Sequence, residues 1–293
     1  MTRPDTYDCA PTLTDAQMLD FCMDGYMMLE RVVPDEINRQ AIAYTDRNPS
    51  GEPVSLLDES WFFDQVICNP VAAGAIRSLL GRDFHLPVLL SNHRREGFDD
   101  VPEKWHVDGN YRFNHELSYL QVFYYPQDTP PEMGPTEIVP GSHFWRNQTR
   151  AMWHMNRILG SKKTAAPAGT IFITVYQIWH RAGMLRRPGV RNLLKYFYWR
   201  TTPPKRDWVT DPEFDFANVD YEGCPADGRP FAGKYAEQFR AARDAAEMFY
   251  WLCGSHDRFQ VAGGQSWPLP ADRNGEPYGF PGPPPAAVDA QSD

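Results

Sequence analysis

Residues 170–199 of this chain read TIFITVYQIWHRAGMLRRPGVRNLLKYFYW. Two apolar runs, 170–179 and 191–199, enclose a connection that is rich in Arg, Pro and Gly. The β-branched and aromatic residues of the runs are typical of strands, and the Gly and Pro of the connection indicate a turn region. We therefore expect two strands, with His180 at the end of the first and Arg191 at the start of the second.

Further short runs of the same kind begin at about residue 84. They are separated by turn-forming clusters such as Pro-Gln-Asp-Thr-Pro-Pro (126–131) and Pro-Gly-Ser (140–142). Many short strands with Gly- and Pro-rich connections predict an antiparallel sandwich or barrel. Besides 170–179 and 191–199, the expected strands are 85–91, 117–125 and 137–139.

The part of the chain before residue 84 carries helix signals instead. Thr14 can cap a helix that ends at Gly25, because Thr is favoured at an N-cap and Gly at a helix C-terminus. Pro34 followed by two acidic residues opens a second helix. The sequence therefore predicts helices at about 14–24, 34–45 and 71–80, and a short strand at 26–29.

The composition limits the classes of partner. The chain has 293 residues and a net charge of −9, which disfavours general nucleic-acid binding because such binding depends on phosphate neutralisation. No apolar run approaches the roughly 18–20 residues of a membrane span, and the N-terminus has no apolar signal core. The five cysteines are scattered without a CxxC pair, which suits free thiols in a reducing compartment. We expect a cytoplasmic monomer or homodimer that acts on a small molecule, without nucleic-acid or membrane partners.

His106-Val107-Asp108 is the first motif that carries chemistry. Side chains two residues apart in a strand point to the same face, so an imidazole and a carboxylate can converge here. One more His from a distant strand would complete the two-His, one-carboxylate face of non-haem iron sites, which leaves positions open for a co-substrate and dioxygen. A lone His-x-Asp is weak evidence, because the chain has 8 His and 38 acidic residues.

His180 and Arg191 supply the second motif. They stand eleven positions apart across the turn-rich connection, so a hairpin would return Arg191 to the neighbourhood of His180. A guanidinium in that place can bind a carboxylate through two parallel hydrogen bonds. The two motifs together predict a metal pocket beside a carboxylate anchor.

These landmarks, with the Gly134–His143 stretch (GPTEIVPGSH) between them, resemble the phytanoyl-CoA dioxygenase family of iron(II)- and 2-oxoglutarate-dependent oxygenases. The segments Phe21–Tyr26, Val33–Glu36 and Asn69–Ala72 are similar to the opening of that family. The resemblance covers about residues 13–200.

The resemblance implies a double-stranded β-helix (jelly-roll, cupin-like) core that uses Fe(II), 2-oxoglutarate and O2, and releases succinate and CO2. His106, Asp108 and His180 match the iron ligands, Arg191 matches the arginine that binds the far carboxylate of 2-oxoglutarate, and Thr136 matches a position that often donates a hydroxyl to it. Many members carry Ser or Thr two residues after the distal His, where this chain has Ala182. Related halogenases replace the carboxylate ligand by a small residue, so Asp108 favours hydroxylation or another oxidation over halogenation, and we expect hydroxylation of an aliphatic carbon.

The expected fold class is mainly β with flanking helices. We expect a single oxygenase domain over residues 1–263, with a helical part at 1–83, the jelly-roll core at about 84–201 and a helical extension at 202–263. The Pro- and Gly-rich residues 264–293 are expected to form a tail.

Other residues receive weaker assignments. Tyr111 and Phe113, just after the first motif, are the best candidates to line a substrate pocket. His85, His115 and His154 have no partner at ligand spacing and are treated as ordinary polar residues, and Glu103, Glu132 and Glu137 are expected at the surface. Two other functions stay open at this point: a non-catalytic jelly-roll protein that binds a ligand, and a zinc-dependent hydrolase that uses the same three residues.

Overall fold

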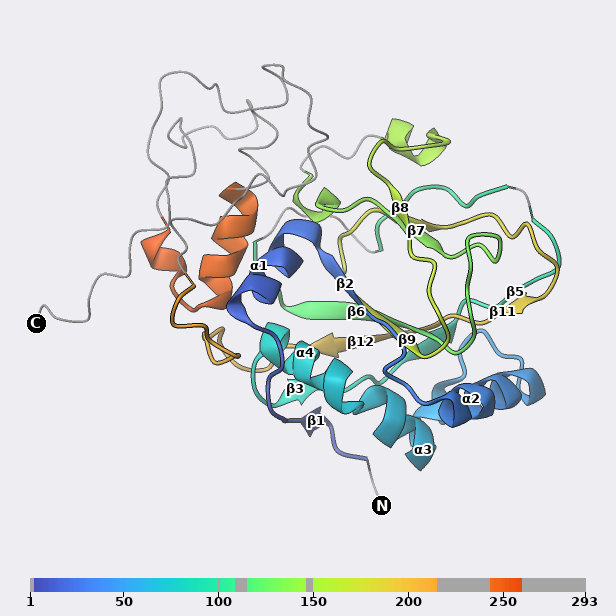
Figure 1. The fold of residues 1–293 in the computed structure, drawn as a ribbon, viewed down its shortest axis with the longest axis horizontal. Helices are drawn as coiled ribbons and strands as arrows, with labels where there is room; N and C mark the ends of the chain where they lie inside the picture. Colours follow the sequence, from blue (N-terminus) through green and yellow to red (C-terminus); the bar gives the residue numbers. More distant parts are fainter. Residues whose placement is uncertain (1–2, 100, 109–114, 146–149, 215–242, 260–293) are drawn as a thin grey trace, which may run out of the picture.

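Antiparallel sheets and a group of helices make up the part of the chain that the computed structural model describes (Figure 1). The described residues are 3–99, 101–108, 115–145, 150–214 and 243–259. The expected tail at 264–293 lies outside them. No helix of this part is long and apolar enough to cross a membrane.

The main sheet has seven strands in the order β1-β3-β12-β6-β9-β2, with β4 also paired to β12. Its longest strands, β6, β9 and β12, are rich in aromatic and β-branched residues; β6 and β9 are buried on both faces, whereas β12 alternates between buried and partly buried residues. The strands are β1 (Thr6–Tyr7), β2 (Tyr26–Leu29), β3 (Phe84–His85), β4 (Leu90–Asn92), β6 (Tyr119–Tyr125), β9 (Thr170–Val175) and β12 (Leu194–Trp199).

Two smaller sheets complete the β structure. One has the order β10-β7-β8, with β7 (Thr136–Ile138), β8 (Lys162–Lys163) and β10 (His180–Ala182). The other pairs β5 (Arg95–Glu96) with β11 (Val190–Arg191). Together with the main sheet they form the jelly-roll core that the sequence predicted.

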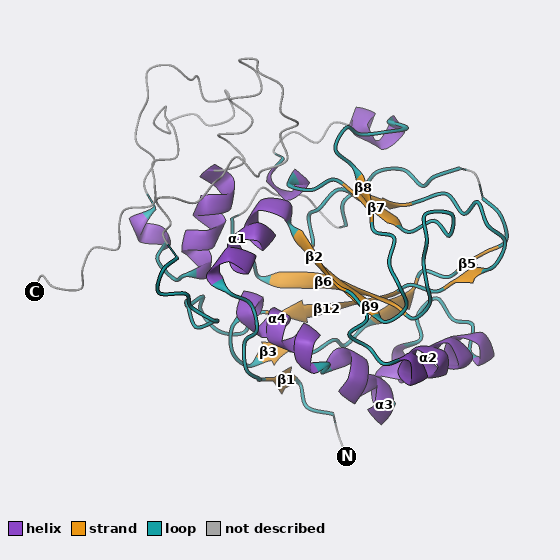
Figure 2. Ribbon diagram, viewed as in Figure 1, coloured by secondary structure: helices purple, strands orange, loops and turns teal. Residues whose placement is uncertain are grey.

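The helices predicted for the N-terminal part lie where the sequence placed them. α1 (Asp15–Asp24) begins with a capping box, in which Thr14 and Gln17 exchange hydrogen bonds, and Gly25 ends it in the left-handed conformation. Figure 2 shows α2, α3 and α4 along one side of the main sheet. The other helices are α2 (Asp35–Arg47), α3 (Ser60–Phe62) and α4 (Pro70–Leu80); η2 (Phe63–Ile67) is a π-helical turn, and η1 (Val54–Asp58), η3 (Ser142–Phe144), η4 (Arg150–His154) and η7 (His256–Arg258) are 3-10 turns.

The predicted strand pair differs from the observed one. β9 and β12 do not pair with each other, because β6 lies between them: Tyr124 of β6 is opposite Ile171 on one side and Leu194 on the other. β9 also ends at Val175, before the expected residue 179, and His180 begins a strand of a different sheet. A hydrophobic run indicates that a strand forms, but it does not specify the sheet that the strand joins.

Residues after β12 return to the N-terminal helices. The carboxylate of Asp15 is fully buried and accepts hydrogen bonds from Arg206, the indole of Trp208 and the backbone N–H of Asp211. Residues 243–252 form a helix beside α1 (Figure 1), and its Phe249 is part of the main hydrophobic core.

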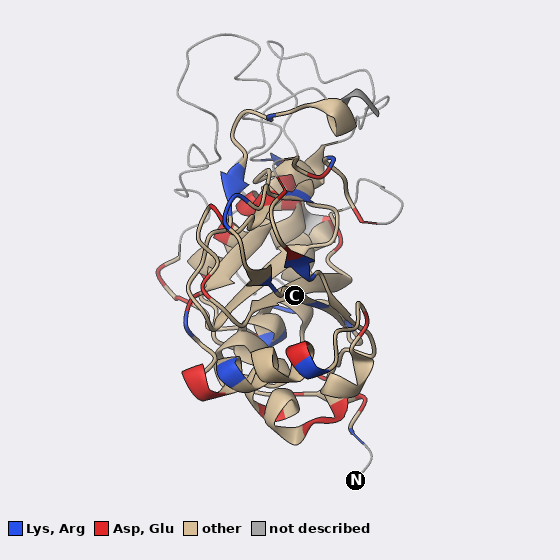
Figure 3. Cartoon of the chain, turned by 90° about the vertical axis from the view of Figure 1, so that its right-hand side faces the viewer, with Lys and Arg blue, Asp and Glu red and all other residues tan. Residues whose placement is uncertain are grey.

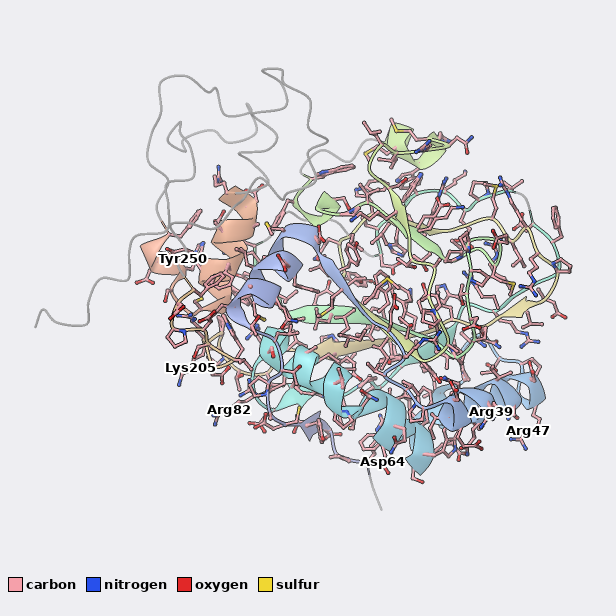
Figure 4. The ribbon with its side chains drawn as sticks, in the orientation of Figure 1. Arg39, Arg47, Asp64, Arg82, Lys205 and Tyr250 are labelled. Carbon is pink, nitrogen blue, oxygen red and sulfur yellow. The ribbon has the colours of Figure 1, made fainter. Side chains whose placement is uncertain are left out.

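Charged residues lie mainly at the periphery. Figure 3 shows acidic and basic residues interspersed on the face that it presents, with no separation by sign. Figure 4 shows Arg39, Arg47 and Arg82 pointing away from the sheets. The charged side chains that can form an enclosed site are therefore the few that are buried.

Candidate metal centre

A pair of backbone hydrogen bonds holds the two predicted histidines side by side. The N–H of His106 donates to the carbonyl of His180 at 3.0 Å, and the N–H of His180 donates to the carbonyl of His106 at 2.9 Å. Their ring centroids are 4.4 Å apart. Asp108, two residues after His106, brings its carboxylate to 3.9 Å from Nε2 of His106 and 3.6 Å from Nε2 of His180. One ligand atom from each of the three lies within 4.8 Å of the others.

The hydrogen bonds of both imidazoles suit metal binding. Nδ1 of His106 lies 2.9 Å from the carbonyl of Lys104, and Nδ1 of His180 lies 3.0 Å from the carbonyl of Ile178. A carbonyl only accepts, so each Nδ1 carries a proton and Nε2 is the ring nitrogen that faces Asp108. Burial, followed by the neighbouring His106, lowers the pKa of His180 to about 4, so this imidazole is neutral at pH 7. Neutral imidazoles with this second bond are the usual form of metal-binding histidine.

Asp108 is held in its charged form by its surroundings. Burial alone would raise the pKa of Asp108, but His180 and Lys195 outweigh that effect and lower it below its ordinary value. Nζ of Lys195 lies 3.1 Å from Oδ2 of Asp108, and the lysine is largely buried. Two imidazoles and one carboxylate that converge on one point are the donor set of non-haem iron(II) sites.

Arg191 is a fully buried cation. Its guanidinium donates to the backbone carbonyls of Gly134 and His93, and its Nε has no hydrogen-bond partner. Burial lowers the pKa of Arg191 to about 10, which still leaves it charged at neutral pH. Within the described ranges no carboxylate forms an ion pair with it. A buried charge without a counter-ion is costly, so this position favours an anionic ligand.

Arg191 and the metal cluster share one neighbour. Burial, followed by Lys195 and Arg191, lowers the pKa of His93 to about 4, and Asp108 and His180 also act on it. His93 is therefore close enough to both for their charges to act on it, and its carbonyl accepts a hydrogen bond from Arg191. The predicted hairpin is not present, because β10 pairs with β7 and β11 pairs with β5, but both motifs act on the same residue, His93.

The remaining predicted site residues have different outcomes. Thr136 is buried in β7 and is directly opposite Ala182 of β10, which places both on the sheet that carries His180. Tyr111 and Phe113 lie outside the described residues.

Two buried charges near the site were not predicted. Lys195 had no local signal, because strand alternation does not run unbroken from Arg191 of β11 to Lys195 of β12. Glu137 was expected at the surface, and this was wrong. It is buried and binds Arg181 at 2.7 and 2.6 Å, and Arg181 in turn lies 4.4 Å over the ring of Trp105. Arg181 directly follows His180, and Trp105 directly precedes His106. The contact between Arg181 and Trp105 therefore adjoins both histidines of the cluster.

Comparisons with known proteins identify the fold and not a sequence family. No family model matches the chain, and no curated protein sequence matches it. Among solved structures, HygX from Streptomyces hygroscopicus with nickel and 2-oxoglutarate bound is similar, with a TM-score of 0.54, 16% identity, and coverage of 65% of this chain and 88% of HygX.

Two structures from nogalamycin biosynthesis are also similar. The non-heme alpha ketoglutarate dependent carbocyclase SnoK gives a TM-score of 0.51 at 18% identity, with coverage of 69% of this chain and 91% of SnoK. The non-heme alpha ketoglutarate dependent epimerase SnoN gives 0.50 at 19% identity, with coverage of 63% and 81%. All three share the jelly-roll arrangement with this chain.

Proposed function

We propose that this protein is an iron(II)- and 2-oxoglutarate-dependent oxygenase that hydroxylates an aliphatic carbon of a small molecule. The observation that carries the proposal is the combination of the His106, Asp108 and His180 cluster with a buried arginine, Arg191, that pairs with no carboxylate of the described residues. A metal site alone would not require the arginine. A co-substrate that chelates the metal at one end and carries a carboxylate at the other would use the metal cluster and the arginine together.

The three clustered residues fit the metal by their donor chemistry. His180 is neutral and Asp108 is charged at pH 7, and Nδ1 of each histidine is bonded to a backbone carbonyl, which leaves Nε2 as the ligand atom. When bound, iron(II) supplies the chemistry that couples decarboxylation of 2-oxoglutarate by dioxygen to oxidation of a carbon–hydrogen bond. HygX binds iron, and also nickel with 2-oxoglutarate, in the same fold, which supports this choice of metal and co-substrate.

The roles of the other residues follow from their charge and position. Arg191 holds the distal carboxylate of 2-oxoglutarate by a charge-assisted pair, and the carboxylate supplies its missing counter-ion. The carbonyl groups of Gly134 and His93 orient the guanidinium before the co-substrate arrives. Lys195 pairs with Asp108 and adds a positive charge beside the three proposed ligands, which favours a dianionic co-substrate. Thr136 donates its hydroxyl to the co-substrate.

The substrate class is a small natural product, amino acid or acyl compound. HygX has been solved with hygromycin B and SnoN with nogalamycin RO, so the fold accommodates substrates of this size. Hydroxylation is proposed over halogenation because Asp108 occupies the position that must be small to admit a halide. The epimerase and carbocyclase among the similar structures show that other oxidative outcomes occur on this fold.

Turnover of the co-substrate tests this proposal without knowledge of the substrate. Iron(II)-loaded protein in aerated buffer is expected to convert 2-oxoglutarate slowly into succinate, and a panel of small-molecule substrates should accelerate it. Asp108→Ala is the matched variant that should lose this turnover. Succinate formation that is equal in the wild type and in Asp108→Ala would refute the proposal, as would none in the wild type across the panel.

A further inference from the structure

A second cluster of metal-binding side chains lies outside the proposed iron site. It joins His115, Glu247 of the helix at residues 243–252, and His256 of η7. One ligand atom of each lies within 4.8 Å of the others. The cluster has the same two-His, one-carboxylate composition as the first, but it shares no residue with it.

The two imidazoles converge on one carboxylate oxygen. Nδ1 of His115 lies 3.4 Å from Oε1 of Glu247, and Nε2 of His256 lies 3.2 Å from the same atom. The rings stack with centroids 4.0 Å apart and planes at 16°. Oε2 of Glu247 lies 3.7 Å from the guanidinium of Arg243. Oε2 therefore faces a cation, and Oε1 faces the two histidines.

These separations match the edges of a zinc coordination tetrahedron. With bonds of 2.0–2.1 Å, two ligand atoms of a tetrahedral zinc ion lie about 3.3 Å apart. The observed 3.4 and 3.2 Å fit this edge. The corresponding distances in the iron-site cluster are longer, at 3.9 and 3.6 Å. Two of the three ligand-atom pairs of the second cluster are therefore near this spacing, and the two imidazole nitrogens lie within 4.8 Å of each other.

The position of the cluster in the chain suggests what a metal would do there. His115 follows Asp108 by seven residues, whereas Glu247 and His256 belong to the C-terminal part. Glu247 and His115 are largely buried and His256 is half-exposed, with side-chain exposures of 15, 21 and 41%. A bound ion would cross-link the C-terminal helix to the segment that leaves the metal motif, and the exposed His256 side provides an entry path.

We propose that His115, Glu247 and His256 form a second divalent-metal site, of the zinc class, that fastens the C-terminal helix to the segment following Asp108. The fourth tetrahedral position is left for water or another small ligand, since the described residues contribute no further His, Cys or carboxylate. The site is independent of the proposed oxygenase function.

Metal stoichiometry separates the two sites. Full-length protein stripped by a chelator is titrated with Co(II), whose tetrahedral complexes absorb strongly in the visible. The wild type should bind two equivalents, and one of them should show the tetrahedral spectrum. A double variant, His106→Ala with His180→Ala, should keep that spectrum. His256→Ala and Glu247→Gln should lose it, and His154→Ala, at an exposed position, should retain it.

A stability measurement makes the result independent of spectroscopy. Zn(II) at 100 times its Kd should raise the midpoint of thermal unfolding of the His106→Ala, His180→Ala variant by roughly 5 °C. Adding His256→Ala should abolish the shift. Circular dichroism confirms that each variant is folded. A folded His106→Ala, His180→Ala protein that neither binds Co(II) nor gains stability from Zn(II) would overturn the proposal, as would an unchanged response after His256→Ala.

Discussion

His106 and His180 exchange backbone hydrogen bonds of 3.0 and 2.9 Å, although 74 positions separate them in the sequence. This exchange places their rings 4.4 Å apart and adds Asp108 to the same face through the two-residue period of an extended chain. The backbone of the fold thus brings the three candidate ligands together, since the pairing of His106 with His180 is part of the β structure.

Replacement of Arg191 tests the carboxylate anchor. Arg191→Ala should weaken 2-oxoglutarate binding by about 2–5 kcal/mol, because it removes one partner of a buried charge pair. Affinity is measured by titrating 2-oxoglutarate into the metal-loaded protein under anaerobic conditions. Arg186→Ala is the matched control, since Arg186 is exposed in the same connection and its loss should change affinity by less than about 0.5 kcal/mol. Equal affinities of the Arg191→Ala and Arg186→Ala variants for 2-oxoglutarate would show that Arg191 does not bind the co-substrate.

The buried Arg181–Glu137 pair should stabilise both histidine-bearing segments. Glu137→Gln should lower the free energy of unfolding by about 3–5 kcal/mol, because Arg181 would remain buried without a counter-ion. The exposed Arg39–Glu36 pair of α2, whose side chains are 68% and 75% accessible, supplies the control. Glu36→Gln should cost less than about 0.5 kcal/mol. Urea unfolding of both variants compares them, and similar losses would contradict a supporting role for Glu137.

Gly134 positions a carbonyl that orients Arg191. Its φ is +63°, and a Cβ there would lie 2.7 Å from the carbonyl oxygen of Gly183. Gly134→Ala should therefore cost more than the about 1–3 kcal/mol of a strained backbone alone, and should also weaken 2-oxoglutarate binding. Gly160→Ala isolates the strain, because φ there is +81° but nothing lies near its Cβ. If Gly134→Ala and Gly160→Ala lose the same unfolding free energy and bind 2-oxoglutarate equally well, the close approach of Gly134 to Gly183 affects neither stability nor co-substrate binding.

His143 should make the fold sensitive to acid. Its Nε2 donates to the carbonyl of Cys22, while its buried Nδ1 has no partner. Burial lowers the pKa of His143 to about 4. The unfolded chain, with a pKa near 6.5, binds more protons in this range. The contribution of His143 is therefore complete above pH 6.5 and is lost as the pH falls toward 4.

The corresponding measurement compares the wild type with His143→Gln, which keeps a donor for Cys22 but does not titrate. Between pH 7.5 and 4.5 the wild type should lose roughly 2–3 kcal/mol more unfolding free energy than the variant. Equal losses would mean that protonation of His143 is not coupled to unfolding.

Local patterns predicted the parts of the site that depend on local geometry. His106 and Asp108 follow from strand period, and the α1 capping box follows from Thr14 and Gln17. The partners of His115 were missed, because Glu247 is 132 positions away and no spacing rule connects them. Glu137 was misplaced because a carboxylate is usually exposed, and only the three-dimensional fold brings Arg181 opposite it. Sequence patterns identify which residues can perform chemistry, whereas tertiary pairing decides which of them meet.

The visible spectrum of the anaerobic complex tests the central proposal most directly. Iron(II) is added to the stripped protein, followed by 2-oxoglutarate, and the metal-to-ligand charge-transfer band is recorded. The wild type should develop this band with one equivalent of 2-oxoglutarate, and the His180→Ala variant should not. Iron(II) bound by the wild type with no such band at saturating 2-oxoglutarate would show that the His106, Asp108 and His180 cluster is not a 2-oxoglutarate-dependent iron site.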